Sequence, residues 1–247
     1  MNPTGNTILI TGGGSGIGRA LARRFHDLGN VVIVAGRRQP ALDETIADRS
    51  NMHAIAVDLD DAVALSHFAT QLVSTHPALN VLINNAGIMR SEELTGSRDL
   101  ADTGATVITN LLAPIRLIDA LVGHLAKQPG SAIVNVSSGL AFVPLVTAPT
   151  YSATKAAIHS YTVSLRAQLS GTTEVIELVP PAVQTELTPG QSDRPGYLPL
   201  ADFIDEVMTL FQQKPTPPEI CVERVGFLRR AEAEGRFDAA LAAVNAH

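Results

Sequence analysis

The sequence is poor in residues that form cross-links, metal clusters and aromatic patches. Its 247 residues include a single cysteine, Cys221, which excludes an internal disulfide framework and a cysteine cluster for structural zinc. The seven histidines show neither His-x-x-x-His nor His-x-x-Glu-His spacing, so we expect no catalytic metal. There is no tryptophan, and there are only three tyrosines and three lysines. Because both types are so rare, a spaced tyrosine–lysine pair in this chain carries weight.

Charge of one sign and membrane-type segments are also missing. The 18 basic and 24 acidic residues give a formal net charge of −6, without the basic stripe that a sequence-independent nucleic-acid binder needs. Residues 1–6 lack the basic and apolar regions of a secretory signal. The longest apolar stretch, about 105–125, contains Arg116, Asp119 and His124, which predicts a buried helix and not a membrane span. We therefore expect a cytoplasmic protein with no nucleic-acid or membrane partner.

Short apolar runs alternate with longer helical patterns along most of the chain. The runs at 7–11, 31–36, 53–57, 81–84, 132–136 and 175–179 are mostly continuously apolar, as in parallel strands covered on both faces. Segments such as 16–28 and 61–75 are long enough for crossover helices, and Gly29 stands where a glycine commonly ends a helix. This alternation predicts one α/β domain over residues 1–247: a doubly wound parallel sheet, Rossmann-like, with helices on both faces.

The texture of the sequence changes after Pro180. Proline and glycine cluster up to Pro199, which predicts a mobile substrate loop over 182–199. Two further helical patterns follow, at about 200–213 and 223–244, and we expect residues 223–247 to form a helical appendage of the same domain.

A glycine-rich segment follows the first predicted strand and opens the first predicted helix. It reads Thr11-Gly12-Gly13-Gly14-Ser15-Gly16-Ile17-Gly18. Glycines let the backbone approach a pyrophosphate, and the helix N-terminus offers free N–H groups and a positive dipole end. An ordinary strand-to-helix turn is the plainer interpretation, but the flanking strand and helix favour a nucleotide site.

The end of the second predicted strand indicates which nucleotide. NAD sites usually carry an acidic residue about 20 residues after the glycines, to accept from the ribose 2′-hydroxyl. Here Arg37 and Arg38 occupy this region, and two guanidiniums can pair with a 2′-phosphate. A solvated arginine pair is the alternative; beside the glycine loop, we favour NADP(H) over NAD(H).

Tyr151 and Lys155 form the spaced pair. Their i, i+4 spacing places both side chains on one face of a helical pattern that starts near Pro149. A phenol has an ordinary pKa of about 10, and a neighbouring ammonium lowers it toward neutral pH. A surface helix with an amphipathic tyrosine is the alternative, but the nucleotide loop favours an acid/base pair.

These motifs give the sequence a clear resemblance to a known family. It resembles the short-chain dehydrogenase/reductase family, in the branch with a Thr-Gly-x-x-x-Gly-x-Gly motif, from residue 7 to about 187. The resemblance also includes Asn84-Asn85-Ala86-Gly87, Asn110, Ile133-Val134-Asn135-Val136-Ser137-Ser138 and the Tyr151–Lys155 pair. Ser138-Gly139-Leu140-Ala141-Phe142 and Pro180-Pro181-Ala182-Val183 are further similar to a bacterial subgroup associated with D-alanylation of teichoic acids.

The resemblance implies hydride transfer between a nicotinamide and a carbonyl or secondary alcohol, with Tyr151 as general acid/base. It implies that Ser138, which precedes Tyr151 by the family's usual interval, orients the carbonyl, and that Lys155 also binds the nicotinamide ribose. Asn110 would hold a water that links Lys155 to solvent. The implied catalytic residues are Asn110, Ser138, Tyr151 and Lys155. The expected cofactor-binding residues are Gly12, Gly14, Ser15, Gly16, Ile17, Gly18, Arg37, Arg38, Asp58, Leu59, Asn84, Ala86, Gly87, Tyr151, Lys155, Val183 and Thr185.

Substrate and assembly are less defined by the sequence. Expected pocket residues are mostly apolar: Met89, Gly139, Leu140, Phe142, Val143 and the loop 186–199. They favour an apolar ketone or secondary alcohol as the small-molecule substrate. Pro181 replaces the family's usual glycine and stiffens the entry to the loop. The apolar face at 106–125 and the Tyr151 helix predict a homodimer or homotetramer, with the dimer the more secure.

Two other functional classes remain open. One is an NADP-binding sensor or scaffold that keeps the fold without turnover, against which Ser138, Tyr151 and Lys155 argue. The other is a nucleotide-sugar epimerase or dehydratase, which shares the Tyr-x-x-x-Lys logic but differs in glycine spacing and substrate domain.

Overall fold

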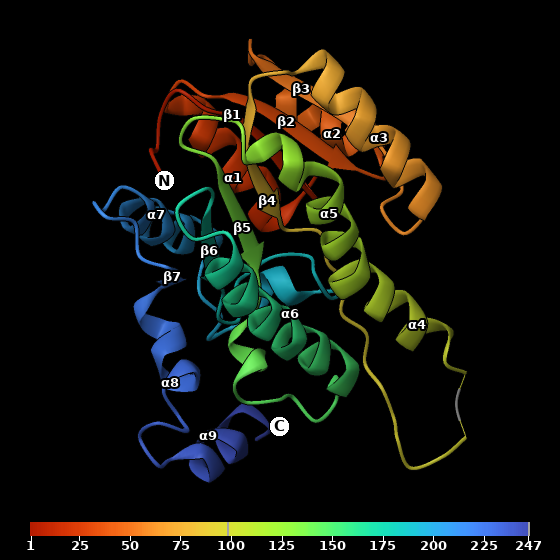
Figure 1. Cartoon of the computed structure of the whole chain (residues 1–247). Coiled ribbons are helices and arrows are strands. Elements are labelled where there is room, and N and C mark those ends of the chain that lie inside the picture. Colours follow the sequence, from red (N-terminus) through yellow and green to blue (C-terminus); the bar gives the residue numbers. More distant parts are fainter. Residues whose placement is uncertain (98, 247) are drawn as a thin grey trace.

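A computed structural model describes residues 1–97 and 99–246. Its seven strands form one parallel sheet in the order β3-β2-β1-β4-β5-β6-β7 (Figure 1). The strands are β1 (Thr7–Thr11), β2 (Val31–Gly36), β3 (Met52–Ala56), β4 (Leu79–Asn84), β5 (Ala132–Val136), β6 (Glu174–Val179) and β7 (Glu219–Cys221). The predicted doubly wound sheet is confirmed, and the first six strands lie within two residues of the predicted runs. The short edge strand β7 was not predicted.

Helices cover both faces of the sheet (Figure 1). They are α1 (Gly16–Asp27), α2 (Gln39–Ile46), α3 (Ala62–Thr75), α4 (Ala101–Val107), α5 (Ala113–Leu125), α6 (Pro149–Gln168), α7 (Leu200–Phe211), α8 (Gly226–Arg229) and α9 (Phe237–Val244). Successive side chains of a strand point to opposite faces, which separates two cores. Ile8 and Ile10 pack in one core with α1, α2 and α7, whereas Leu9 packs in the other with α3, α5 and α6.

The start of α3 and the end of α1 show the local residue types that typically begin and end helices. The Asp61 side chain accepts hydrogen bonds from the backbone N–H groups of Val63 and Ala64, and so caps the N-terminus of α3. Gly29 has a φ of +85°, the left-handed conformation that glycine adopts after the last turn of a helix.

The apolar stretch that the sequence assigns to one buried helix is interrupted. A π-helical turn, Ile108–Leu112, joins α4 to α5. Among the described residues, Ala101–Leu125 is the one helical stretch long and apolar enough to cross a membrane, a property that buried helices of other proteins share. Its side chains Leu117, Leu121 and Leu125 pack in the core with α3.

The helical pattern expected over 223–244 is divided into short helices in the structure. The segment contains a 3₁₀ turn (Glu223–Val225), α8 and α9, with residues 230–236 outside any helix. Gly235 has a φ of +66°, which breaks the helix, and Ala231 and Ala240 turn inward against Val143. Residue 247, the last of the predicted appendage 223–247, lies outside the described residues.

Candidate active site

A cavity of about 540 Å³ lies at the carboxyl ends of the central strands. The sheet order reverses between β1 and β4, and helices leave toward opposite faces there, which opens a crevice at the end of the sheet. The glycine loop after β1, the arginine pair after β2 and the Tyr151 helix all contribute to its wall. Segments far apart in the sequence therefore meet at one edge.

The glycine loop has the backbone conformations that its composition predicts. Gly12 and Gly16 have φ values of +66° and +50°. A Cβ atom at Gly12 would lie 2.8 Å from the Cα of Ala86, so the loop approaches the end of β4 closely. The side chain of Ser15, the residue before α1, makes no capping hydrogen bond to the helix. The N–H groups of the first turn of α1 therefore remain available to an anion.

A polar clamp that the sequence did not predict holds this loop against β4. Thr11 Oγ1 accepts hydrogen bonds from the N–H groups of Asn85 (3.0 Å) and Ala86 (3.1 Å). The Asn85 amide in turn donates to the Thr11 carbonyl at 2.9 Å. Thr11 belongs to the glycine-rich segment and Asn85 to the Asn84–Gly87 motif. The contact between them depends on the pairing of β1 with β4, which no sequence spacing reveals.

Arg37 and Arg38 line the cavity and are exposed. Among residues 1–97 and 99–246, neither guanidinium pairs with a carboxylate. Both charges are thus free to bind an anionic group. Asp58 and Leu59, which follow β3, also line the cavity.

Tyr151 and Lys155 lie one turn apart on α6, and Ser138 lies at the end of β5. Tyr151 is 6% exposed, Lys155 4% and Ser138 7%, and all three line the cavity. The Lys155 ammonium is 5.5 Å from the centroid of the Tyr151 ring and donates to the Val136 carbonyl at 2.9 Å. The helix and the strand end thus bring the three predicted side chains together.

Burial controls the ionisation of this pair. Desolvation raises the pKa of the Tyr151 phenol to about 12, although a side-chain hydrogen bond with Ser138 acts in the opposite direction. Desolvation lowers the pKa of the Lys155 ammonium to about 8, and the charge of Glu177 opposes this shift. Burial of the phenol is thus the larger effect on the pKa of Tyr151, and the lowering of that pKa by Lys155 stays a prediction.

Asn110 occupies the π-helical turn and is 2% exposed. Its Oδ1 accepts from the N–H of Ile88 and its Nδ2 donates to the carbonyl of Ile88, both at 2.9 Å. Extra residues in a helical turn re-aim a side chain, and such turns are frequent at functional sites. Asn110 here fixes the segment after β4 that carries Gly87, and it does not line the cavity.

The cavity wall contains most of the predicted cofactor-binding residues. They are Gly12, Ser15, Gly16, Ile17, Arg37, Arg38, Asp58, Leu59, Ala86, Gly87, Tyr151, Lys155, Val183 and Thr185. Gly14, Gly18 and Asn84 are outside the wall. Gly18 packs against Asn85 and the Gly12 carbonyl, and Asn84 donates to Asn135 Oδ1 at 2.9 Å, so both support the wall from behind.

The predicted substrate-pocket residues agree less well with the cavity wall than the predicted cofactor-binding residues do. Met89, Gly139, Leu140, Phe142 and Val143 are not in the cavity wall, whereas Glu186, Leu187 and Gln191 of the loop are. Val143 is fully buried against the C-terminal segment, and a Cβ at Gly139 would lie 2.9 Å from Leu228. The C-terminal segment covers this region, which the sequence did not reveal. Arg90 and Thr109 line the cavity without having been predicted.

Comparisons with known proteins show which family the sequence is similar to. The profile of the family described as short chain dehydrogenase matches residues 6–195. The uncharacterised oxidoreductase DltE of Bacillus subtilis is 41% identical over 94% of this chain and 93% of its own length. Sulfoacetaldehyde reductase 2 of Chromohalobacter salexigens is 33% identical over 73% of this chain and 74% of its own.

Solved structures share the fold. A short-chain dehydrogenase from Burkholderia cenocepacia in complex with NADP has a TM-score of 0.83 at 24% identity and covers 98% of both chains. One from Sphingobium yanoikuyae in complex with NADPH has a TM-score of 0.80 at 24% identity, over 96% of this chain and 95% of that one. A 3-ketoacyl-(acyl-carrier-protein) reductase from Brucella melitensis complexed with NADH has a TM-score of 0.77 at 23% identity, over 87% and 95%. From the family profile and the relatives, this chain belongs to the short-chain dehydrogenase/reductase family, as an oxidoreductase similar to DltE over nearly its whole length.

Proposed function

We propose that the protein transfers a hydride between NADP(H) and a carbonyl or secondary alcohol group of a small molecule. The observation that carries this proposal is the position of Ser138, Tyr151 and Lys155. All three are buried in the wall of one cavity that also contains the glycine loop and two arginines without a carboxylate partner among the described residues. The donors fit the proposed cofactor, since N–H groups at the start of α1 suit a pyrophosphate and guanidiniums suit a 2′-phosphate.

In this proposal the protein residues position the substrate and move its proton. When bound, the nicotinamide supplies the hydride to the carbonyl carbon or accepts it from the carbinol carbon. In the reducing direction Tyr151 donates its phenol proton to the substrate oxygen, and Ser138 donates a hydrogen bond to the same oxygen. The high pKa of the Tyr151 phenol keeps it protonated at neutral pH, the form that reduction requires. Lys155 stabilises the phenolate that forms and binds the nicotinamide ribose.

The preference for NADP(H) rests on Arg37 and Arg38. The fold itself accommodates either nucleotide, since structural neighbours are complexed with NADP, NADPH or NADH. Discrimination must therefore come from the side chains that meet the ribose. The guanidiniums after β2 supply positive charge there, which favours the nucleotide with the additional phosphate.

We further propose that residues 182–199 close over the substrate as a mobile loop of a single domain. Val183, Thr185, Glu186, Leu187 and Gln191 of this loop line the cavity. Most hydrogen bonds of the loop join residues of the loop itself, such as Gln191 Nε2 to the Val183 carbonyl at 2.8 Å and the Leu198 N–H to the Ala182 carbonyl at 2.9 Å. A segment with these properties can open and close without unfolding the sheet.

A homodimer is proposed on the side of the molecule formed by α4, α5 and α6 (Figure 1). Leu112, in the π-helical turn between α4 and α5, is 37% exposed, and Val163 on α6 is 46% exposed. Pairing of two copies through these helices would cover both side chains.

Cofactor titration followed by a carbonyl screen tests the proposed function. We expect NADPH to bind more tightly than NADH, and at least one small carbonyl compound to cause NADPH-dependent loss of nicotinamide absorbance. Binding of NADPH without turnover of any aldehyde or ketone would favour the silent sensor or scaffold instead. Equal affinity for NADH and NADPH would remove the role proposed for Arg37 and Arg38.

A further inference from the structure

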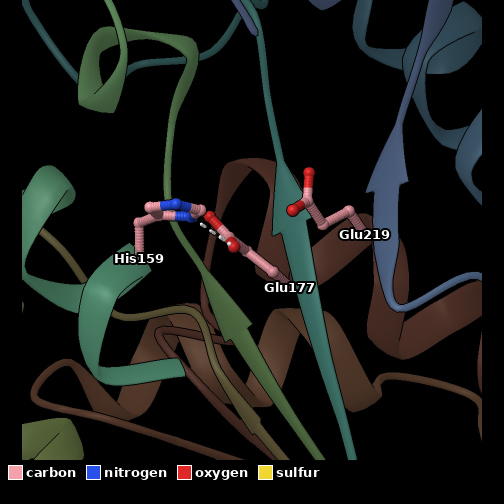
Figure 2. Close-up of side chains that lie close together, drawn as sticks. All are labelled: His159, Glu177 and Glu219. Carbon is pink, nitrogen blue, oxygen red and sulfur yellow. Dashed lines mark hydrogen bonds and ion pairs between the residues drawn. The ribbon is translucent and has the colours of Figure 1, made fainter. Parts of the chain in front are cut away.

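A second polar cluster lies behind the catalytic helix, outside the cavity. It consists of His159 on α6, Glu177 on β6 and Glu219 on β7, whose side chains approach one another across three elements (Figure 2). One nitrogen or oxygen atom from each residue lies within 4.8 Å of the other two. His159 follows Lys155 by one helical turn, yet no role in the proposed reaction requires the cluster.

Glu177 is incompletely satisfied for a buried carboxylate. Its side chain is fully buried, and Oε2 forms a hydrogen bond with His159 Nδ1 at 2.7 Å. Within the described chain, Oε1 is buried and accepts no hydrogen bond from any residue. Buried carboxylates are normally paired and hydrogen-bonded through both oxygens, because desolvation of an unpaired charge is costly. The open oxygen thus indicates a missing positively charged partner.

Glu219 is oriented toward the cluster by an arginine. The Arg229 guanidinium donates to Oε2 at 2.7 Å and to Oε1 at 3.0 Å. Each carboxylate oxygen has two lone pairs. Oε2 also accepts from the Cys221 thiol at 4.0 Å, so the free lone pair is on Oε1. Carboxylates that bind metals are commonly held by such outer partners. Arg229 therefore fixes Glu219 without occupying it completely.

The imidazole of His159 is also held in place. The Phe142 ring packs edge-on against it with centroids 4.8 Å apart, and Arg229 lies 4.5 Å from the Phe142 centroid. The ring nitrogen Nδ1 consequently faces Glu177. All three donor groups are pre-oriented, from residues that the chain separates by 18 and 42 positions (177 − 159 and 219 − 177).

We propose that His159, Glu177 and Glu219 bind one Zn²⁺ ion. Imidazole nitrogen and carboxylate oxygens are zinc ligands, and the imidazole disfavours the hard cations Mg²⁺ and Ca²⁺, which prefer all-oxygen sites. The ion takes the place of the proton between Nδ1 and Oε2 and neutralises the open Oε1.

The site is structural in this proposal. It joins the catalytic helix α6 to the edge strand β7, and through Arg229 to α8. It would therefore attach the C-terminal segment, which covers Gly139 and Val143, to the part of the molecule that carries Tyr151 and Lys155.

Zinc binding to the purified full chain, free of any histidine tag and treated with chelator, tests this proposal. The starting protein carries His53→Gln and His76→Gln, which remove another imidazole pair whose ring centroids lie 4.8 Å apart. We expect calorimetric titration with ZnSO₄ to give one ion per chain. In the same background, Glu177→Gln should weaken the affinity by more than about tenfold, since loss of even an outer partner has an effect of this order.

Co²⁺ absorption tests the metal site without substitution of His159, Glu177 or Glu219. Co²⁺ at the site should give visible d–d absorption of a four- or five-coordinate ion, and an equimolar amount of Zn²⁺ should remove it. Where Glu177→Gln changes the circular dichroism of the fold, Glu219→Gln serves in its place. Absence of 1:1 binding, a Co²⁺ spectrum of the aquo ion, or equal affinity in a folded Glu177→Gln variant would overturn the proposal. None of these outcomes depends on catalytic activity.

Discussion

Tyr151 and Lys155 are both almost fully buried in the cavity wall, and burial moves their pKa values in opposite directions. At the scale of single residues, desolvation is therefore the largest influence on the proposed chemistry. The spacing of the pair was readable in the sequence, but its ionisation was not, because the number of atoms around a phenol depends on tertiary packing.

Removal of the Tyr151 hydroxyl should abolish turnover without removing the cofactor. For Tyr151→Phe we expect kcat for carbonyl reduction to fall by about 10²–10⁴-fold, since no other group replaces the positioned acid. NADPH affinity, measured by fluorescence titration, should stay unchanged. Tyr161→Phe, on the same helix but outside the cavity wall, is the matched control and should retain activity. Turnover in Tyr151→Phe equal to that of the control would contradict the assignment.

The low pKa of Lys155 predicts a pH-dependent contribution to stability. The folded chain releases this proton at about pH 8, whereas an unperturbed lysine holds it to 10.5. Between these values the unfolded state binds more protons, so the free energy of unfolding rises with pH there. The difference in that free energy between the wild type and Lys155→Met should therefore increase by up to about 3 kcal/mol between pH 8 and pH 10.5.

Urea unfolding of both proteins at several pH values measures this difference. Tyr151 is present in both, so its own titration largely cancels. A difference that stays constant from pH 7.5 to pH 11 would show that Lys155 titrates normally in the folded chain.

Arg37 and Arg38 should determine the choice of nucleotide. A charge-assisted hydrogen bond contributes about 1.5–3 kcal/mol, so Arg37→Ala with Arg38→Ala should raise KM for NADPH at least about tenfold. KM for NADH should change little, because it lacks the 2′-phosphate. Arg24→Ala removes an exposed arginine that pairs with Asp205 away from the cavity and provides the control. A similar rise in KM for both nucleotides would contradict a 2′-phosphate contact.

At the scale of elements, the position of α1 relative to β4 depends on Gly18. A Cβ atom there would lie 2.4 Å from both the Asn85 amide nitrogen and the Gly12 carbonyl oxygen. Gly18→Ala must therefore shift the helix or the clamp between β1 and β4. We expect it to destabilise the fold by about 1–3 kcal/mol and to weaken NADPH binding.

Gly104→Ala is the matched control on another helix. Apart from its own helix backbone, a Cβ at Gly104 would meet no atom of the described residues within 4 Å, and alanine is the better helix former. This variant should be stabilised by about 0.5–1 kcal/mol, measured by urea unfolding. Destabilisation of both variants to the same extent would show that the effect at Gly18 is not steric.

Element boundaries were largely predictable where the local pattern was strong. Strands β1, β2 and β5 begin and end at the predicted residues, because continuous β-branched runs bounded by glycine or polar residues define them locally. The π-helical turn at Asn110 and the strand β7 were not predictable. The turn depends on the contact of Asn110 with Ile88, and a strand of three residues depends on its partner β6.

At the scale of the whole molecule, the proposed dimer makes a direct prediction. Val163→Glu places a charge on the exposed apolar side of α6 and should convert a dimer to a monomer, because an interface would have to desolvate it. Light scattering coupled to gel filtration measures the mass. Val63→Glu is the matched control, because Val63 is also an exposed valine (65%) but lies on α3. The mass of this variant in solution should equal that of the wild type. A monomeric wild type, or a dimeric Val163→Glu, would contradict the proposed interface.

The sequence by itself determined the fold class, the glycine loop and the Tyr151–Lys155 pair, because their signals are periodicities and spacings within a few residues. Only the tertiary structure decided which side chains meet from distant segments. It placed Thr11 against Asn85, packed Gly139 and Val143 of the expected pocket against the C-terminal segment, and brought His159, Glu177 and Glu219 together. The physical reason is that burial and contact depend on packing between elements, which no single segment of the chain encodes.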